Sequence, residues 1–144
     1  AFGAKVIYYS ASGAPAQEGY EQVDFETLLT QSDIISVHAP LNEHTEGLIN
    51  SKAFEKMRSS CIFLNLGRGP IVDEQALYNA LVRNQIAAAG LDVLCEEPMS
   101  ADNPLVQFKD SKRLLITPHI AWASVEARTH LMEIIHGQVK DFFA

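Results

Sequence analysis

The sequence predicts an α/β fold with a doubly wound parallel sheet. Short apolar runs rich in β-branched residues alternate with amphipathic helical patterns along the whole chain, a spacing typical of βαβ units. Most of these apolar runs end at glycine or proline, which break strands. The 144 residues are 47% hydrophobic and 20% charged, which suits one globular domain with a sizeable core. We therefore expect helices on both faces of one parallel sheet.

The first quarter of the chain predicts two strands, a helix and a third strand. Residues 5–9 are β-branched and aromatic, and the following SASGAP predicts a loop. Residues 20–23 fit a short edge strand. Asp24 can cap a helix that carries Phe25, Leu28 and Leu29 on its inner face. Residues 34–37 form the next apolar strand, which ends at His38-Ala39-Pro40.

The middle of the chain predicts two helices around a buried strand. Ser51 is a suitable N-cap for a helix that turns Ala53, Phe54 and Met57 inward. Residues 61–66 are an apolar run that stops at Gly67-Arg68-Gly69-Pro70, so they predict a strand and a tight turn. Asp73 can cap the helix after that turn, whose apolar stripe stops near Asn84.

The last third predicts two more strands and a long final helix. Residues 87–93 form a strand of small residues, 103–108 fit a short helical turn, and 114–117 form a last strand that ends at Pro118. From Ser124 a helix continues to the C-terminus. Its apolar residues are too many for one narrow face, so we expect something else to cover part of it: Leu131, Met132, Ile134, Ile135, Val139, Phe142 and Phe143.

Composition argues against several classes of partner. The net charge of -7 and the lack of a Lys/Arg cluster argue against nucleic acid, although small anions can still bind locally. Cys61 and Cys95 lack CxxC spacing and a nearby histidine pair, so we expect neither a zinc site nor a disulfide, and a reducing cytoplasm. No segment approaches the length of a membrane span, and Lys5 interrupts the apolar start, which fits a signal peptide poorly.

Polar groups follow three different predicted strands. Arg68, the segment 92–97 and His119 each come just after an apolar run. A parallel sheet brings the carboxyl ends of its strands to one edge, where ligands bind, so these groups can share a crevice. Arg68, flanked by two glycines, can meet a small carboxylate as a fork and is our first candidate for a substrate anchor. The alternative is an arginine in an ordinary exposed turn.

A histidine and two carboxylates are candidates for proton chemistry. The side chain of a histidine can give or take one proton near neutral pH, which makes His119 a candidate for proton transfer, although a histidine at a strand end is often structural. Glu97, just before Pro98, can accept from its far ring nitrogen and fix the tautomer. Asp92, among apolar neighbours, needs a donor, either a ligand amide or the backbone of the next turn. His38 can contact a ligand, and Trp122 fits a pocket wall or packing under the long helix.

Taken together and in order, these segments resemble the D-isomer-specific 2-hydroxyacid dehydrogenases. The motifs that carry the resemblance are NLGRGPIVDEQAL, AAAGLDVLCEEP and LLITPHIAWAS, supported by SDIISVHAPLNEHTEGLI and AFGAKVIYY. They cover nearly the whole chain. TPHIAWAS and SADNPL look most like glycerate dehydrogenases, also called hydroxypyruvate reductases, with Trp122 as the discriminating residue.

The resemblance implies a role for each candidate. Arg68 would bind the substrate carboxylate and polarise the carbonyl, and His119, held by Glu97, would protonate the carbonyl oxygen as hydride is transferred. Asp92 would accept from the nicotinamide carboxamide. The implied substrate is a small 2-keto or D-2-hydroxy acid such as hydroxypyruvate or glyoxylate. The implied cofactor-binding residues are Ser10, His38, Ala39, Pro40, Thr45, Leu66, Gly67, Arg68, Asp92, His119 and Ala121.

Two departures from the family pattern affect these expectations. Ser10 stands where NAD-selective members carry an acid for the ribose hydroxyls, and no arginine accompanies it. We therefore expect NAD or NADP with weak discrimination. The sequence also lacks a strand-GxGxxG-helix unit, so the resemblance implies that 1–144 is a partial Rossmann-like NAD(P)-binding domain without its substrate domain.

The missing unit has physical consequences. In the family's sheet order its strand lies centrally, between 5–9 and 34–37. Without it, neighbouring strands lose ladder partners and expose apolar surface, so we expect this piece alone to be poorly stable or to associate with another copy, as a homodimer. We also expect the piece alone to be inactive. A nucleotide-sensing corepressor-like protein of the same family is an alternative function, and an unrelated α/β domain with only an architectural likeness is another.

Overall fold

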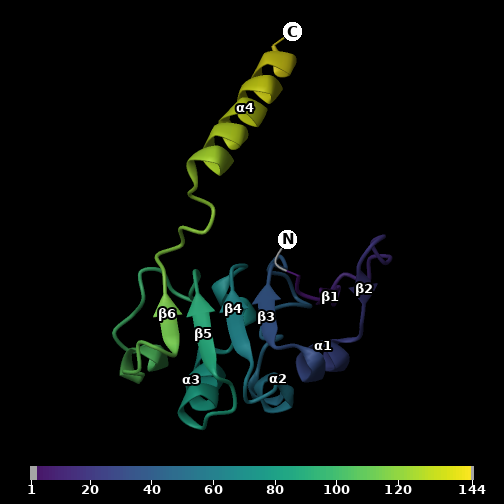
Figure 1. Cartoon of the computed structure of the whole chain (residues 1–144). Coiled ribbons are helices and arrows are strands. Elements are labelled where there is room, and N and C mark those ends of the chain that lie inside the picture. Colours follow the sequence, from purple (N-terminus) through teal and green to yellow (C-terminus); the bar gives the residue numbers. More distant parts are fainter. Residues whose placement is uncertain (1–2, 144) are drawn as a thin grey trace.

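The computed structural model describes residues 3–143 and contains two parallel sheets (Figure 1). The larger sheet has four strands in the order β3-β4-β5-β6, and all neighbouring strands are parallel. The smaller sheet is the pair β1-β2. The strands are β1 (Ile7–Tyr8), β2 (Glu21–Gln22), β3 (Ile34–Val37), β4 (Ile62–Asn65), β5 (Ala88–Leu91) and β6 (Leu114–Ile116).

α-Helices connect consecutive strands from β2 to β5, as the sequence predicts, and a 3₁₀ turn lies between β5 and β6. The helices are α1 (Phe25–Gln31), α2 (Ser51–Lys56), α3 (Glu74–Val82) and α4 (Val125–Phe142), with short 3₁₀ turns η1 (Gly69–Ile71) and η2 (Pro104–Gln107). The predicted N-caps Asp24, Asp73 and Ser124 are confirmed, since each side chain accepts from a first-turn amide. The N-cap predicted for α2 is wrong by one residue. Asn50 accepts from the amides of Lys52 and Ala53, and Ser51 begins the helix.

The core lies between the four-stranded sheet and helices α1, α2 and α3. Alternate side chains of the strands, such as Ile35 of β3 and Phe63 of β4, are buried against these helices. Phe54 of α2 packs edge-on against Phe63 of β4, with ring centroids 5.5 Å apart. Since this packing fixes the strand register, it also fixes where each strand ends.

The α/β fold with parallel sheets is confirmed, but among the described residues the helices between the strands of the larger sheet cover one face only, so helices on both faces of a doubly wound sheet stay a prediction. Successive strands from β3 to β6 are added in one direction, and right-handed crossovers then place every connecting helix on the same side. Neighbouring helices accordingly contact each other, α1 with α2 and α2 with α3. The opposite face is apolar and open, with Ile34, Ile62 and Leu115 exposed by 60%, 40% and 64%.

The strands β1 and β2 stand apart from the larger sheet. Ile7 pairs with Glu21 and Tyr8 with Gln22, and Lys5 forms an ion pair with Glu21 at 2.7 Å. No ladder joins β1 to β3 within residues 3–143. The expectation that a further strand lies between 5–9 and 34–37 stays a prediction.

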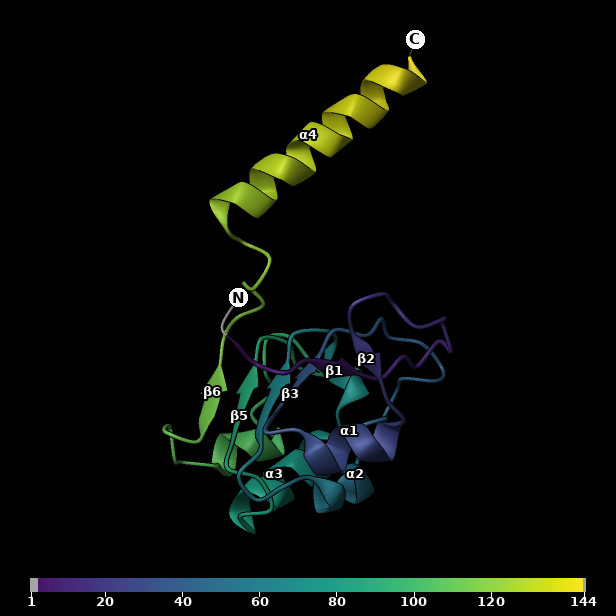
Figure 2. The same cartoon turned by 45° about the vertical axis from the view of Figure 1, so that its right-hand side comes forward.

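The final helix α4 projects away from the rest of the chain (Figure 2). None of its residues is buried, and its apolar side chains, among them Leu131, Ile135 and Phe142, are exposed. No surface within residues 3–143 of this chain therefore covers α4, and the expectation that something else covers it stays a prediction. Within that range no helix is both long enough and apolar enough to cross a membrane.

Candidate active site

The predicted polar groups lie at one edge of the four-stranded sheet. Arg68 follows β4, Asp92 and Glu97 follow β5, and His119 follows β6, so three neighbouring strands deliver them to the same carboxyl edge. That edge is the usual ligand-binding side of a parallel α/β sheet. Figure 1 shows the ends of β4, β5 and β6 side by side.

A cleft of about 490 Å³ opens between the turns that follow β3 and β4. Its size suits a small ligand or part of a dinucleotide. The two turns pack closely at Gly67, where a Cβ atom would lie 3.1 Å from the carbonyl oxygen of Ala39. Except for Leu41, its lining residues are ones that the sequence predicted for the cofactor: His38, Ala39, Pro40, Leu41, Leu66, Gly67 and Arg68.

The turn that carries Arg68 is held by a buried asparagine. Asn65 Oδ1 accepts the amide of Gly67 at 3.1 Å, and its Nδ2 donates to the carbonyl of Arg68 at 3.0 Å. The Arg68 side chain is exposed, and Nη1 donates to the Gly67 carbonyl at 2.8 Å. Among residues 3–143 Arg68 forms no ion pair with an acid. Its guanidinium can therefore bind an external carboxylate.

The Arg68 turn touches the segment that carries Glu97. A Cβ atom on Gly69 would lie 2.0 Å from the carbonyl group of Leu94, so the two backbones are in direct contact there. The amide of Leu94 in turn donates to Glu97 Oε1 at 3.0 Å. This contact fixes the position of Arg68 relative to Glu97.

His119 and Glu97 form the pair that the sequence predicts. Nδ1 of His119 lies 2.9 Å from Oε2 of Glu97, and both side chains are about 40% exposed. The Leu94 amide and the His119 ring hold the pKa of Glu97 below its ordinary value, so Glu97 is ionised at neutral pH. Because Glu97 accepts from Nδ1, Nε2 is the ring nitrogen left for exchange of a proton with a ligand.

The backbone of His119 is strained. Its φ of 53° lies in the left-handed region, which costs a non-glycine residue roughly 1 kcal/mol or more. The indole N–H of Trp122 donates to the His119 carbonyl at 2.8 Å, and the His119 amide donates to the Thr117 carbonyl at 3.0 Å. Such strain persists where neighbouring bonds enforce it, and it is concentrated at functional sites.

Asp92 finds its donors in the loop that carries His119. Its Oδ1 accepts from the Thr117 hydroxyl at 2.6 Å and the Ile120 amide at 2.9 Å, and Oδ2 accepts from the Ala121 amide at 2.9 Å. Burial alone would raise the pKa of Asp92, but these three donors and nearby His119 hold it below its ordinary value. The sequence left open whether a ligand amide or the backbone of the next turn donates to Asp92. In the structure the backbone donates, together with the Thr117 hydroxyl.

Other predicted site residues do not line this cleft: Ser10, Thr45, Asp92, Glu97, His119, Ala121 and Trp122. Ser10 lies on the loop after β1, where its hydroxyl is 3.1 Å from that of Ser12. Thr45 is 1% exposed, and its hydroxyl donates to the Pro40 carbonyl at 2.6 Å, so it shapes the loop behind the cleft. Trp122 is exposed and bonds to the His119 turn; it does not pack beneath α4.

Sequence reasoning missed two polar residues, Asn65 and Thr117. Both follow apolar residues at the end of a strand, where the apolar pattern predicts a strand and no functional group. A signal for Thr117 lay in the strand pairing, since Leu91 pairs with Ile116 and the next residues, Asp92 and Thr117, are then neighbours. Asn65 could have been recognised as a polar residue inside a buried apolar run.

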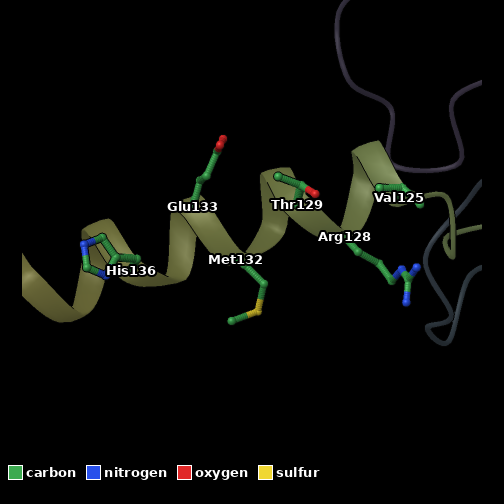
Figure 3. A pocket seen from close by; sticks show the side chains of 6 residues that line it. All are labelled: Val125, Arg128, Thr129, Met132, Glu133 and His136. Atoms are coloured by element: carbon green, nitrogen blue, oxygen red, sulfur yellow. The ribbon is translucent and has the colours of Figure 1, made fainter.

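A second hollow, of about 470 Å³, lies along α4 and contains none of the predicted site residues (Figure 3). Its side chains come from one helix, and in Figure 3 Glu133 and Met132 point to opposite sides of it. They do not converge on a ligand. Residues 3–143 also contain no group of three side chains placed to hold a metal ion.

Comparison with protein families gives a match over residues 1–121 to the family described as "D-isomer specific 2-hydroxyacid dehydrogenase, NAD binding domain". A hydroxypyruvate reductase of Blautia hydrogenotrophica is 44% identical over 144 residues, covering 99% of this chain and 44% of that protein. A glycerate dehydrogenase of Methylorubrum extorquens is 41% identical over 144 residues, covering 100% of this chain and 44% of that protein.

Solved structures of related enzymes also match this chain. An acyclic imino acid reductase in complex with NADPH and D-Arg matches with a TM-score of 0.84 and 36% identity, over 96% of this chain and 43% of that one. A D-lactate dehydrogenase with NAD+ from Lactobacillus jensenii matches with a TM-score of 0.80 and 36% identity, over 92% and 43%. The chain thus spans less than half the length of these relatives.

Proposed function

Because this chain belongs to the NAD-binding domain family of the D-isomer-specific 2-hydroxyacid dehydrogenases, we propose that its full-length protein interconverts a small 2-keto acid and its D-2-hydroxy acid. Hydroxypyruvate and glyoxylate are the proposed substrates, after the names of relatives such as a hydroxypyruvate reductase and a Thermococcus litoralis glyoxylate reductase. The chain would supply the cofactor side of the active site. Parts of the protein outside it would enclose the substrate, so the chain alone is expected to be inactive.

The observation that carries this proposal is the His119–Glu97 pair at 2.9 Å beside the turn that bears Arg68. A reduction of a 2-keto acid needs a cation for the carboxylate and a proton for the carbonyl oxygen. Arg68 offers the cation as a fork, and His119 Nε2 offers the proton. Glu97 holds the His119 ring in one tautomer. The contact of Gly69 with Leu94 fixes the Arg68 turn relative to the segment that carries Glu97.

The residues of the cleft fit a nicotinamide cofactor, which supplies or accepts the hydride when it is bound. Close packing of Gly67 on Ala39 leaves backbone at the cleft floor, and His38 and Arg68 add polar groups on its rim. Asp92 would hold the loop beside the cofactor and accept from its carboxamide. Ser10 supplies neither an acid nor a base for the ribose, so we propose use of either NAD or NADP, and Michaelis constants for NADH and NADPH that differ by more than about tenfold would contradict this.

The test of the proposed function is turnover of NADH and NADPH with hydroxypyruvate and glyoxylate by the full-length protein and its Arg68 variants. Arg68→Ala should lower kcat/KM for the keto acid roughly a hundredfold or more, because a charged two-point contact is lost. Arg68→Lys should recover only a small part, since an ammonium cannot form the fork. Arg83→Ala, at the distant end of α3, is the matched control and should leave kcat/KM unchanged.

The outcomes separate enzyme from sensor. Turnover by the parent together with loss in Arg68→Ala supports the proposal. Turnover that survives Arg68→Ala would remove Arg68 as the substrate anchor. Tight binding of dinucleotide without turnover of any small 2-keto acid would favour the nucleotide-sensing alternative, and the catalytic roles of Arg68, Glu97 and His119 would then be withdrawn.

A further inference from the structure

We propose that Thr117 is a positioning residue for His119, acting through Asp92. This inference rests on the proposed function, because it assumes that His119 is the acid/base. Thr117 contacts neither the cleft nor the His119 ring through its hydroxyl. Its effect passes through a carboxylate to the loop that carries the histidine.

The sheet register brings Thr117 and Asp92 together. Leu91 at the end of β5 pairs with Ile116 at the end of β6, so the residues that follow are adjacent. The Thr117 amide donates to the Leu91 carbonyl at 2.9 Å, and its hydroxyl donates to Asp92 Oδ1 at 2.6 Å. The hydroxyl bond is short, as expected for donation to a charged acceptor. Thr117 therefore sets the rotamer of a buried carboxylate.

Asp92 passes this orientation to the histidine loop. The oxygen that accepts from Thr117 also accepts from the Ile120 amide, and the other oxygen accepts from the Ala121 amide. A carboxylate that turned away from Thr117 would lose or lengthen both amide bonds. The residue just before these amides is His119, with its left-handed φ of 53°.

The strain at His119 makes this clamp important. A left-handed non-glycine residue relaxes toward negative φ unless its neighbours are held, and relaxation would swing the imidazole away from Glu97. Trp122 holds the carbonyl side of His119, but Trp122 is exposed and its bond competes with water. Asp92 itself is 4% exposed and its bonds are partly buried, and Thr117 completes them.

The experiment compares the full-length protein with its Thr117→Val, Thr117→Ala and Thr117→Ser variants. Valine keeps the shape and removes the hydroxyl, whereas serine keeps the hydroxyl. Thr27→Val is the matched control, since the Thr27 hydroxyl also donates to an aspartate, Asp24 Oδ2 at 2.8 Å, far from the site in α1. Two readouts are needed, hydrogen exchange of a peptide that covers 118–123, and kcat and KM with hydroxypyruvate.

We expect the amides of Ile120 and Ala121 to exchange about tenfold faster in Thr117→Val, and kcat to fall about tenfold with the KM for NADH within about twofold, the effect of one lost hydrogen bond to a charged group. Serine should restore both, and Thr27→Val should change neither. Thr117→Ala replaces valine if that variant does not fold.

Exchange that is the same in a folded Thr117→Val or Thr117→Ala variant as in the parent would overturn the proposal. Equal losses in the serine and valine variants would overturn it as well. Hydrogen exchange does not depend on turnover, so faster exchange in a protein that lacks dehydrogenase activity would contradict the proposed function and leave the clamp standing.

Discussion

Single residues hold this site together through their charge and hydrogen bonds, and Asp92 is the most constrained of them. Three donors and the nearby His119 keep its pKa below the ordinary aspartate value of about 3.9. A carboxyl group whose pKa is lower in the folded state than in the unfolded state stabilises the fold fully at pH values above the unfolded-state pKa. This stability is lost as the pH falls through the folded-state pKa.

Asp92→Asn should therefore reduce the free energy of unfolding at pH 7 and flatten its decline below about pH 4. The neutral amide keeps the shape of the side chain but cannot accept the three hydrogen bonds as a charged carboxylate does. The free energy of unfolding at pH 7 should therefore fall by about 1–3 kcal/mol. Urea unfolding of the full-length protein between pH 3 and pH 7 measures both effects. If the free energy of unfolding fell as steeply below about pH 4 in Asp92→Asn as in the parent, the Asp92 carboxylate would not contribute to the pH dependence of stability.

At this scale the sequence predicted the charged groups better than the neutral ones. Arg68, Glu97 and His119 each follow a strand, and topology alone brings strand ends together, so their proximity was predictable. The hydroxyl of Thr117 acts on the Asp92 carboxylate, and the amide of Asn65 acts on backbone groups of the Arg68 turn. Only the folded chain brings these groups near one another. Thr45 was expected at the cofactor, but it is buried because its hydroxyl caps the turn at Pro40.

Among the elements, the Arg68 turn and the Leu94 segment approach so closely that no Cβ atom fits at Gly69. Gly69→Ala should destabilise the protein by about 1–3 kcal/mol, because its Cβ would collide with the Leu94 backbone and force the two segments apart. It should also reduce kcat/KM for the keto acid, since Arg68 and Glu97 would separate. Thermal unfolding and steady-state kinetics of the full-length protein measure the two effects.

Gly137→Ala is the matched control for this substitution. A Cβ atom on Gly137 meets nothing within 4 Å, and the residue lies inside α4, where alanine favours the helix by about 1 kcal/mol. Kinetics should be unchanged in this control. A Gly69→Ala protein as stable and active as the parent would show that the contact at Leu94 is not needed.

Helices and strands were predictable from periodicity and capping, but the layers were not. Asp24, Asp73 and Ser124 are strong caps with no rival nearby, whereas Asn50 and Ser51 are adjacent and equally capable, so sequence could not choose between them. The number of covered faces depends on the direction in which strands are added. The strands β3 to β6 are added one after another in the same direction across the sheet, and this order leaves one face of the sheet open.

On the scale of the whole molecule, the open sheet face and the bare helix α4 are the main features. Ile34, Ile62 and Leu115 are exposed on one face of the sheet, and the apolar side chains of α4 have no cover within residues 3–143. Exposed apolar surface of this kind promotes association.

The 144-residue chain studied alone should therefore associate at micromolar concentration, and charges on the open face should weaken the association. Sedimentation velocity of the chain and of an Ile34→Lys/Leu115→Lys variant tests this. Glu18→Lys and Lys109→Glu, at exposed polar positions, serve as controls for added charge. A stable monomer in dilute solution would contradict the expectation.

The measurement that tests the central claim most directly is reduction of hydroxypyruvate by the full-length protein with NADH, beside its His119→Gln and Glu97→Gln variants. The proposed function predicts turnover by the parent and a loss of kcat of roughly a hundredfold to ten-thousandfold in His119→Gln, the usual contribution of a general acid. Glu97→Gln should lose less, because it orients the ring without transferring the proton. Parent-like kcat in His119→Gln would contradict the assignment of the proton donor and, with it, the proposed chemistry of this site.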